Sequence, residues 1–153
     1  MGQCITLIYT KQVIDKSDIP AGQIYFEEKG YSIFPLDIDA YEMDNIASSF
    51  REYPSFNTLK ENQSSFSDNA KSIIKLIEQL KIDTLLLQHY SEWGDYPTDV
   101  YSVIVKDGKI YPNRDHDSIE DILEYFVTIE DSPNLDRYRS YEICEYLFNS
   151  QSI

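Results

Sequence analysis

Residues 89–98 read His-Tyr-Ser-Glu-Trp-Gly-Asp-Tyr-Pro-Thr and bring several chemically active side chains into one short segment. An imidazole, a hydroxyl and two carboxylates are available there: His89, Ser91, Glu92 and Asp95. Groups of these types perform general acid–base catalysis. The chain has no G-x-S-x-G motif, and its only other histidine is His116. A small enzyme using this segment is therefore an alternative hypothesis, beside a His89 that is simply hydrogen-bonded within a strand.

The same segment also predicts a protein-binding site. It holds the only tryptophan of the chain, Trp93, and we place it in a loop between two predicted strands, where loops lie at the surface. Exposed Trp and Tyr rings bury a large area at a small entropic cost, so they often dominate interfaces. The competing interpretation is that Trp93 folds back over the end of the sheet. The predicted partner-binding residues of this loop are Tyr90, Glu92, Trp93, Asp95 and Tyr96.

An acidic segment near the C-terminus is the second candidate for partner binding. Residues 113–153 hold three arginines, no lysine and ten acidic residues, a net charge of −7. In a helix, Glu120 and Glu124 lie one turn apart and repel each other. The segment is either a solvated surface whose first acids favour the helix dipole, or a docking face for a basic partner. Its predicted partner-binding residues are Asp115, Asp117, Glu120, Asp121 and Glu124.

The sequence shows no metal or cofactor motif. The acidic groups around His116 and around Asp39 lack the D-x-[DN]-x-[DN]-G pattern of a calcium loop. The five glycines are scattered and form no phosphate-binding loop. Cys4 and Cys144 lie near opposite ends, without the spacing of a zinc site or a disulfide framework. We therefore expect no metal, no cofactor and a reduced, cytoplasmic environment.

The net charge of the chain limits the classes of partner that it can bind. The 153 residues include 27 acidic residues against 13 Lys and Arg, a net charge of −14. Binding to nucleic-acid backbones or to anionic lipids needs clustered Lys and Arg, so we expect neither nucleic acid nor membrane as a partner. No apolar run is long enough for a membrane span. A basic protein is the partner that the charge favours.

Helices and strands follow from periodicity and capping. Apolar residues at helical spacing follow each of the predicted N-caps, Asp39 and Ser67, and so predict two helices. Pro54 is expected to end the first helix, and residues 54–66 are expected to form a polar loop between the two. Strands are predicted over 4–9, 31–36, 84–88 and 99–105, with a return strand after the Asp107-Gly108 turn. Residues 19–29 fit either a short helix or one arm of a hairpin. Two further helices are expected, after Asp117 and over about 140–148.

These elements predict one domain over residues 1–153, of the α/β or α+β class. We expect a mixed sheet of about four or five strands with three or four packed helices. The stripe of the helix after Asp117 is Ile119, Ile122, Leu123 and Phe126.

In profile, the chain resembles the immunity proteins of bacterial toxin–immunity pairs. The resemblance rests on the net charge, on the acidic segment Asp115 to Glu124 and on the loop Tyr90 to Tyr96, and no family motif is matched. It implies a protein that binds one toxin domain, often a cationic nuclease, and blocks its active site or its access to nucleic acid. Two alternatives remain, the small enzyme described above and a phage or plasmid inhibitor that mimics the charge of DNA.

Overall fold

In the part of the chain that the structure describes, six antiparallel strands form one sheet. The computed structural model describes residues 3–28, 30–93 and 96–111, so the helices expected after Asp117 and near 140–148 lie outside the described residues. The sheet order is β2-β3-β1-β4-β5-β6, and every neighbouring pair is antiparallel. The strands are β1 (Gln3–Thr10), β2 (Phe26–Glu28), β3 (Tyr31–Leu36), β4 (Leu85–Trp93), β5 (Tyr96–Lys106) and β6 (Lys109–Tyr111).

Three α-helices connect β3 to β4 within the described part of the chain. They are α1 (Ala40–Phe50), α2 (Phe56–Glu61) and α3 (Asp68–Leu80), with short 3₁₀ helices η1 (Lys16–Asp18) and η2 (Gln63–Ser65). The predicted combination of one sheet with packed helices is confirmed. Within the described residues the sheet has six strands rather than four or five, and its pairs are antiparallel rather than mixed. None of these helices is long and apolar enough to cross a lipid bilayer.

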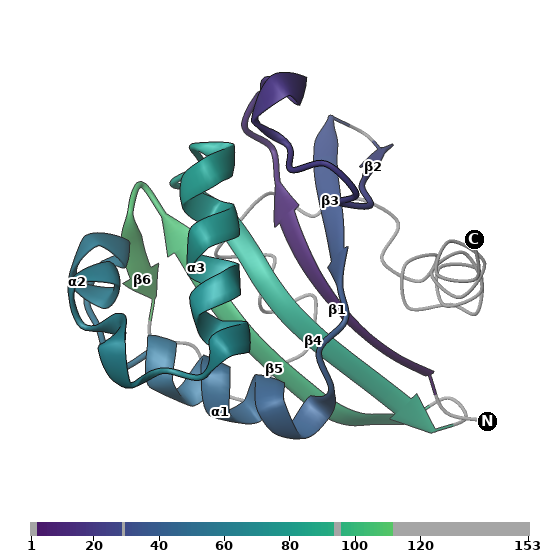
Figure 1. Ribbon diagram of the computed structural model, residues 1–153. Coiled ribbons are helices and arrows are strands. Elements are labelled where there is room, and N and C mark those ends of the chain that lie inside the picture. The colour runs from purple at the N-terminus through teal and green to yellow at the C-terminus, as the bar shows by residue number, and fades with distance from the viewer. Residues whose placement is uncertain (1–2, 29, 94–95, 112–153) are drawn as a thin grey trace.

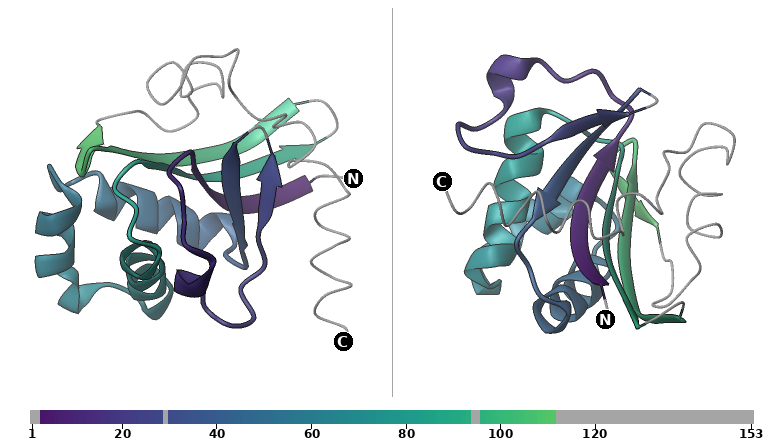
Figure 2. Two further views of the ribbon diagram at one scale, coloured as in Figure 1. Left: turned by 90° about the horizontal axis from the view of Figure 1, so that it is seen from above. Right: turned by 90° about the vertical axis from the view of Figure 1, so that its right-hand side faces the viewer.

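The three helices pack on one face of the sheet (Figures 1 and 2). They bury the apolar stripes that the periodicity predicts, such as Met43, Ile46 and Phe50 of α1. From the sheet, alternate residues enter the same core because successive side chains of a strand point to opposite faces. The sheet residues of this core include Ile8, Phe34, Leu87, Val103 and Ile110.

Both predicted N-caps are confirmed. The Asp39 carboxylate accepts a hydrogen bond from the backbone N–H of Glu42 at 2.8 Å, and the Ser67 hydroxyl accepts one from Ala70 at 3.2 Å. Each bond satisfies one N–H that a helix leaves without an internal partner. The first helix ends at Phe50, before Pro54.

The prediction of a polar loop over residues 54–66 is wrong. Ser55 caps α2 by accepting a hydrogen bond from Thr58, and Phe56 and Leu59 are buried. Two apolar residues in six are too few to show a helical period. The backbone of Phe56 also donates to Gly108 at 2.8 Å, which fixes the start of α2 against the turn before β6.

Of the two expectations for residues 19–29, the hairpin arm is found over Phe26–Glu28, and residues 19–28 contain no helix. β2 pairs with β3, with Glu28 opposite Tyr31, and Gly30 in the turn has a φ of +80°, a backbone region that favours glycine. The Asp107-Gly108 turn between β5 and β6 is also confirmed, and both residues have positive φ as a two-residue hairpin requires.

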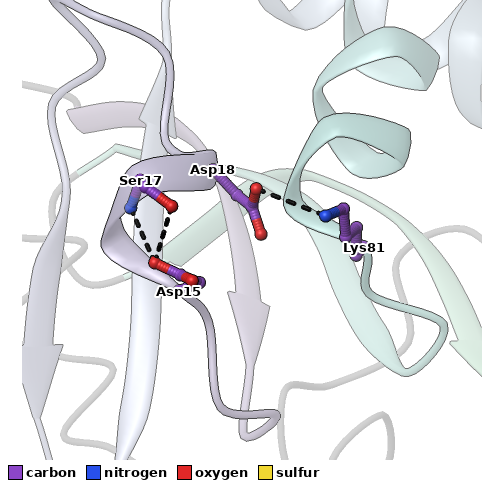
Figure 3. Close-up of polar contacts among 4 residues, drawn as sticks. All are labelled: Asp15, Ser17, Asp18 and Lys81. Carbon is purple, nitrogen blue, oxygen red and sulfur yellow. Dashed lines mark hydrogen bonds and ion pairs between the residues drawn. The ribbon is translucent and has the colours of Figure 1, made fainter.

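The loop between β1 and β2 is held to the end of α3 (Figure 3). Asp15 caps η1 by accepting hydrogen bonds from both the backbone N–H and the hydroxyl of Ser17, at 2.9 and 2.8 Å. Asp18 forms an ion pair with Lys81, the left-handed residue that ends α3, at 3.5 Å. Because the N–H of Ser17 donates to the Asp15 carboxylate, the pKa of that carboxyl lies below its ordinary value.

Candidate binding surface

The segment expected as a loop over residues 89–98 is a hairpin. β4 continues to Trp93 and β5 begins at Tyr96, and these two residues are paired across the strands. The loop prediction is therefore wrong for all but residues 94–95, which lie outside the described residues. Tyr and Trp favour strands, and a Gly-Asp pair is a typical two-residue hairpin connection, so this sequence supports strand pairing almost to its middle.

His89 lies inside the core, between the sheet and the helices. Its side chain is 0% exposed, its Nδ1 lies 2.7 Å from the Thr6 hydroxyl, and its ring packs at a tilt against Tyr101. A solute does not reach an imidazole buried in this way. The interpretation of His89 as a hydrogen-bonded strand residue is confirmed, and catalysis by this histidine is not favoured.

The register places the end of the β4–β5 hairpin beyond the end of β3. Leu36, the last residue of β3, pairs with Thr6, and Thr6 pairs with His89 on the other side. The part of β4 that follows His89 therefore extends past β3, and it carries Tyr90, Glu92 and Trp93. Tyr96 begins β5 at the same end.

The beginning of α1 lies at this same edge of the sheet. The Thr6 hydroxyl donates a hydrogen bond to the Ile38 carbonyl at 2.9 Å, so the chain passes next to His89 just before α1 starts. Figure 1 shows the start of α1 and the end of β4 along one edge of the molecule. The predicted site at the end of β4 therefore lies near the start of α1, a surface that the sequence did not indicate.

We call this surface the acidic edge. It consists of Asp37, Asp39, Tyr41, Glu42 and Asp44. Tyr41 is 79% exposed, and within the described residues only Val13 is a large hydrophobic residue with greater exposure. The described residues supply no ion pair to Asp37 or to Asp44. An exposed aromatic ring among unpaired carboxylates has the composition expected of a binding site for a basic protein.

Two members of the acidic edge also have structural roles. Asp39 caps α1, and the Glu42 carboxylate accepts a hydrogen bond from the Asn69 amide of α3. Both carboxylates lie where the positive end of the helix dipole favours negative charge. These roles do not apply to Asp37, Tyr41 and Asp44.

A cleft of about 370 Å³ opens beside the acidic edge, between α3 and the chain before α1. Its volume lies in the range of ligand pockets. The apolar lining is Pro20, Leu36, Ile38, Ile73 and Leu76. The polar lining is Gln23, Asp37, Asn69, Ser72, Lys75 and Gln79. Asp37 belongs to both the cleft and the acidic edge, so one partner segment can contact both.

The remaining predicted site residues fall outside the described part of the chain. They are Asp95, Asp115, Asp117, Glu120, Asp121 and Glu124. Within the described residues, no group of three or more His, Cys, Asp or Glu side chains is placed to hold a metal ion, and Asp37, Asp39 and Asp44 form no such group.

Comparison of the chain with protein-family models, with curated proteins and with solved structures finds no match. The charge, the exposure and the geometry of the chain itself are therefore the grounds on which a function can be proposed.

Proposed function

We propose that this protein is a non-catalytic binding protein that neutralises a cationic protein, in the manner of an immunity protein that blocks its cognate toxin. The observation that carries the proposal is the acidic edge, where the largely exposed Tyr41 lies among the carboxylates of Asp37, Asp39 and Asp44. The proposal places the protein in the cytoplasm, in keeping with two cysteines that lack disulfide spacing.

Electrostatics and apolar contact make separate contributions to such binding. A net charge of −14 attracts a cationic nuclease over a long range and competes with its polyanionic substrate for the same surface. Once the proteins meet, an exposed tyrosine ring supplies contact area at low entropic cost. We therefore expect charge variants to change the association rate and Tyr41 variants to change the dissociation rate.

The enzyme alternative receives less support. Its base, His89, is fully buried and hydrogen-bonded to Thr6, and its Asp95 lies outside the described residues. The cleft beside the acidic edge contains no histidine, cysteine or second carboxylate in its lining. That lining suits the docking of a side chain with an apolar body and a polar end.

The test uses as its probe the product of the reading frame that adjoins the gene, which the proposal expects to be a basic protein. Purified chain and probe are combined, and affinity and association rate are measured at low and at high salt. Tyr41→Ala should weaken binding by about tenfold or more, because truncating a central aromatic costs about 2 kcal/mol. Val13→Ala, at the other highly exposed apolar residue, is the matched control and should leave the affinity unchanged.

Charge is tested with Asp44→Lys against Glu61→Lys, an exposed acid on α2. Asp44→Lys should slow association at low salt more than Glu61→Lys does, and the difference should shrink when salt screens the field. The proposal is wrong if the probe does not bind, or if it binds the Tyr41 and Asp44 variants as tightly as the unmodified chain.

A further inference from the structure

The cleft between α3 and the chain before α1 is elongated and has an apolar wall. Ile73 and Leu76 of α3 are buried along it, and Leu36 at the end of β3 also lines it. Asn69 and Gln79 line the cleft from positions ten residues apart on α3, which is about 15 Å along the helix axis. The cleft can therefore hold an extended side chain that lies along the helix.

Contacts of α3 show which residues lie at each end of the cleft. Near the start of α3, Asn69 donates a hydrogen bond to the first turn of α1, and Asp37 comes three residues before α1. At the end of α3, Lys81 forms its ion pair with Asp18, which comes two residues before the cleft residue Pro20 (Figure 3). Asp37 therefore lies at the end of the cleft beside the start of α3, and Pro20 lies toward the other end.

Two amide side chains that line the cleft near Asp37 have oxygens available to a ligand. The Asn69 amide bonds to the Glu42 carboxylate, and the Gln23 amide bonds at 3.3 Å to the carbonyl of Pro35, two residues before Asp37. Carboxylates and carbonyls only accept hydrogen bonds, so both contacts use the NH₂ group of the amide. Neither amide oxygen accepts a hydrogen bond from the described residues.

We propose that this cleft binds an arginine side chain of the basic partner, with its guanidinium at Asp37 and its aliphatic stem along the apolar wall. The exposed Asp37 carboxylate has no ion pair within the described residues, and the two amide oxygens lie near it. A guanidinium is planar, stays protonated and has five N–H donors, so it can serve several acceptors at once. Its stem covers apolar surface while the charged head stays at the rim. The inference rests on the proposed function and names the group that the cleft recognises.

Lys75 is the cationic residue among the described lining of the cleft, and it affects the choice of ligand. It comes six residues after Asn69 on α3, about 9 Å along the helix axis, and its side chain is exposed. A charge at that distance, in contact with water, repels a guanidinium at Asp37 only weakly. A lysine ligand has three donors and a more strongly hydrated head, so it gains less from three acceptors. We therefore expect arginine to bind better than lysine.

The direct test uses Nα-acetylarginine methylamide as the probe, with the corresponding citrulline compound as an uncharged control of similar shape. Methyl spectra of the full chain are recorded during a titration with each compound. The arginine compound should shift the resonances of Ile73 and Leu76 saturably and should not shift those of Leu59 in α2, outside the cleft. The citrulline compound should bind several-fold more weakly. Equal binding of the two compounds, or unchanged resonances of Ile73 and Leu76, would overturn the proposal.

Three variants test the residues assigned to the cleft. Asp37→Asn should weaken binding of the arginine compound by about threefold or more, because it removes the charge and keeps the size of the side chain. Glu61→Gln, which removes an exposed charge on α2, is the matched control and should have a smaller effect. Lys75→Gln should strengthen binding, because it removes the repulsion. Unchanged affinity in Asp37→Asn, or weaker binding in Lys75→Gln, would contradict the proposal.

The product of the adjoining reading frame separates this inference from the proposed function. Each arginine of that product is replaced by lysine in turn, and its affinity is measured for the unmodified chain and for Asp37→Asn. One of these replacements should weaken binding less in Asp37→Asn than in the unmodified chain, because the two groups contact each other. A product that binds without any such coupling overturns the inference and leaves the proposed function intact. A product that does not bind contradicts the proposed function, while saturable binding of the arginine compound still supports the assignment of the cleft.

Discussion

The hydroxyl oxygen of Thr6 lies 2.7 Å from Nδ1 of His89, inside the core. The same hydroxyl lies 2.9 Å from the Ile38 carbonyl, which can only accept a hydrogen bond. Since a hydroxyl has one proton and gives it to that carbonyl, Nδ1 of His89 must carry a proton and donate to Thr6. This chain of two hydrogen bonds joins β4, β1 and the start of α1, and it positions the acidic edge against the sheet.

Removal of the Thr6 hydroxyl should therefore destabilise the fold. Thr6→Val keeps the shape of the side chain but leaves the buried His89 N–H and the Ile38 carbonyl without this partner. We expect the free energy of unfolding to fall by about 1–3 kcal/mol, the cost of leaving a buried polar group unsatisfied. Urea unfolding of Thr6→Val measures the change.

Thr6→Ser is the matched control because it keeps the hydroxyl and removes only a methyl group. It should retain the Nδ1-protonated form of His89, which two-bond nitrogen–proton correlation spectra identify. The assigned hydrogen-bond direction is wrong if Thr6→Val is as stable as the unmodified protein. It is also wrong if His89 of the unmodified protein lacks a proton on Nδ1.

Helices α1 and α3 could be predicted from the sequence because their signals are local. A capping residue, Asp39 or Ser67, stands directly before an apolar stripe, and the structure contains both caps. The stability of α2 depends instead on contacts distant in sequence, such as the hydrogen bond from Phe56 to Gly108. No pattern within residues 54–66 indicates a partner in the turn before β6.

The candidate site was only partly predictable for a similar reason. Trp93 attracts notice as the only tryptophan, but the sequence does not say where β4 ends. The exposure of Tyr41 could have been predicted from the sequence. Tyr41 lies off the apolar stripe of Met43, Ile46, Ala47 and Phe50, and Asp39, Glu42 and Asp44 are close to it in the sequence. Its position beside the end of β4 follows from the register of β1 with both neighbours, which local periodicity does not contain.

Asp15 should make one contribution to the pH dependence of stability. Its pKa is lowered first by the backbone N–H of Ser17, then by the Ser17 hydroxyl, with a smaller effect of Lys81. Because the folded pKa lies below the ordinary value of 3.8, this contribution is complete above pH 3.8 and is lost as pH falls through the folded pKa. Ser17→Ala removes the hydroxyl and keeps the N–H, so the Asp15 pKa should rise part of the way toward 3.8.

Carboxyl carbon resonances of Asp15, followed during an acid titration of both proteins, measure this change. The full-length chain is suitable because Asp15 is exposed and titrates without unfolding of the core. Equal Asp15 pKa values in the unmodified protein and in Ser17→Ala would show that the hydroxyl does not stabilise the carboxylate.

The cap of α3 predicts that alanine at Ser67 and alanine at Ser72 change the stability of the protein differently. Ser67→Ala removes the hydroxyl that accepts from the Ala70 N–H and should lower the free energy of unfolding by about 1 kcal/mol. Ser72→Ala is the control, because Ser72 is exposed within the same helix, where alanine is the better helix former. In thermal or urea unfolding, Ser67→Ala should be less stable than the unmodified protein. Ser72→Ala should be as stable as the unmodified protein or more stable. The reverse order would exclude Ser67 as the cap that stabilises α3.

Two glutamines should respond in opposite directions to the same substitution. Gln88 is 3% exposed on the face of the sheet away from the three helices, where it pairs with Leu7, and its Nε2 has no hydrogen-bond partner within the described structure. Gln12 instead accepts hydrogen bonds from the backbone N–H groups of Asp83 and Thr84, at 2.7 and 2.8 Å. Methionine has a similar length and no amide, so it removes the polar group with little change of volume.

Gln88→Met should therefore raise the free energy of unfolding, by about 1 kcal/mol or more, because it removes a buried amide that lacks one of its partners. Gln12→Met should lower it by about 1–2 kcal/mol, because two backbone donors between α3 and β4 lose their acceptor. Urea unfolding of both variants, with the denaturant dependence compared, measures the two changes. If Gln88→Met destabilises the protein as much as Gln12→Met does, the Gln88 amide is hydrogen-bonded in the folded protein and contributes to its stability.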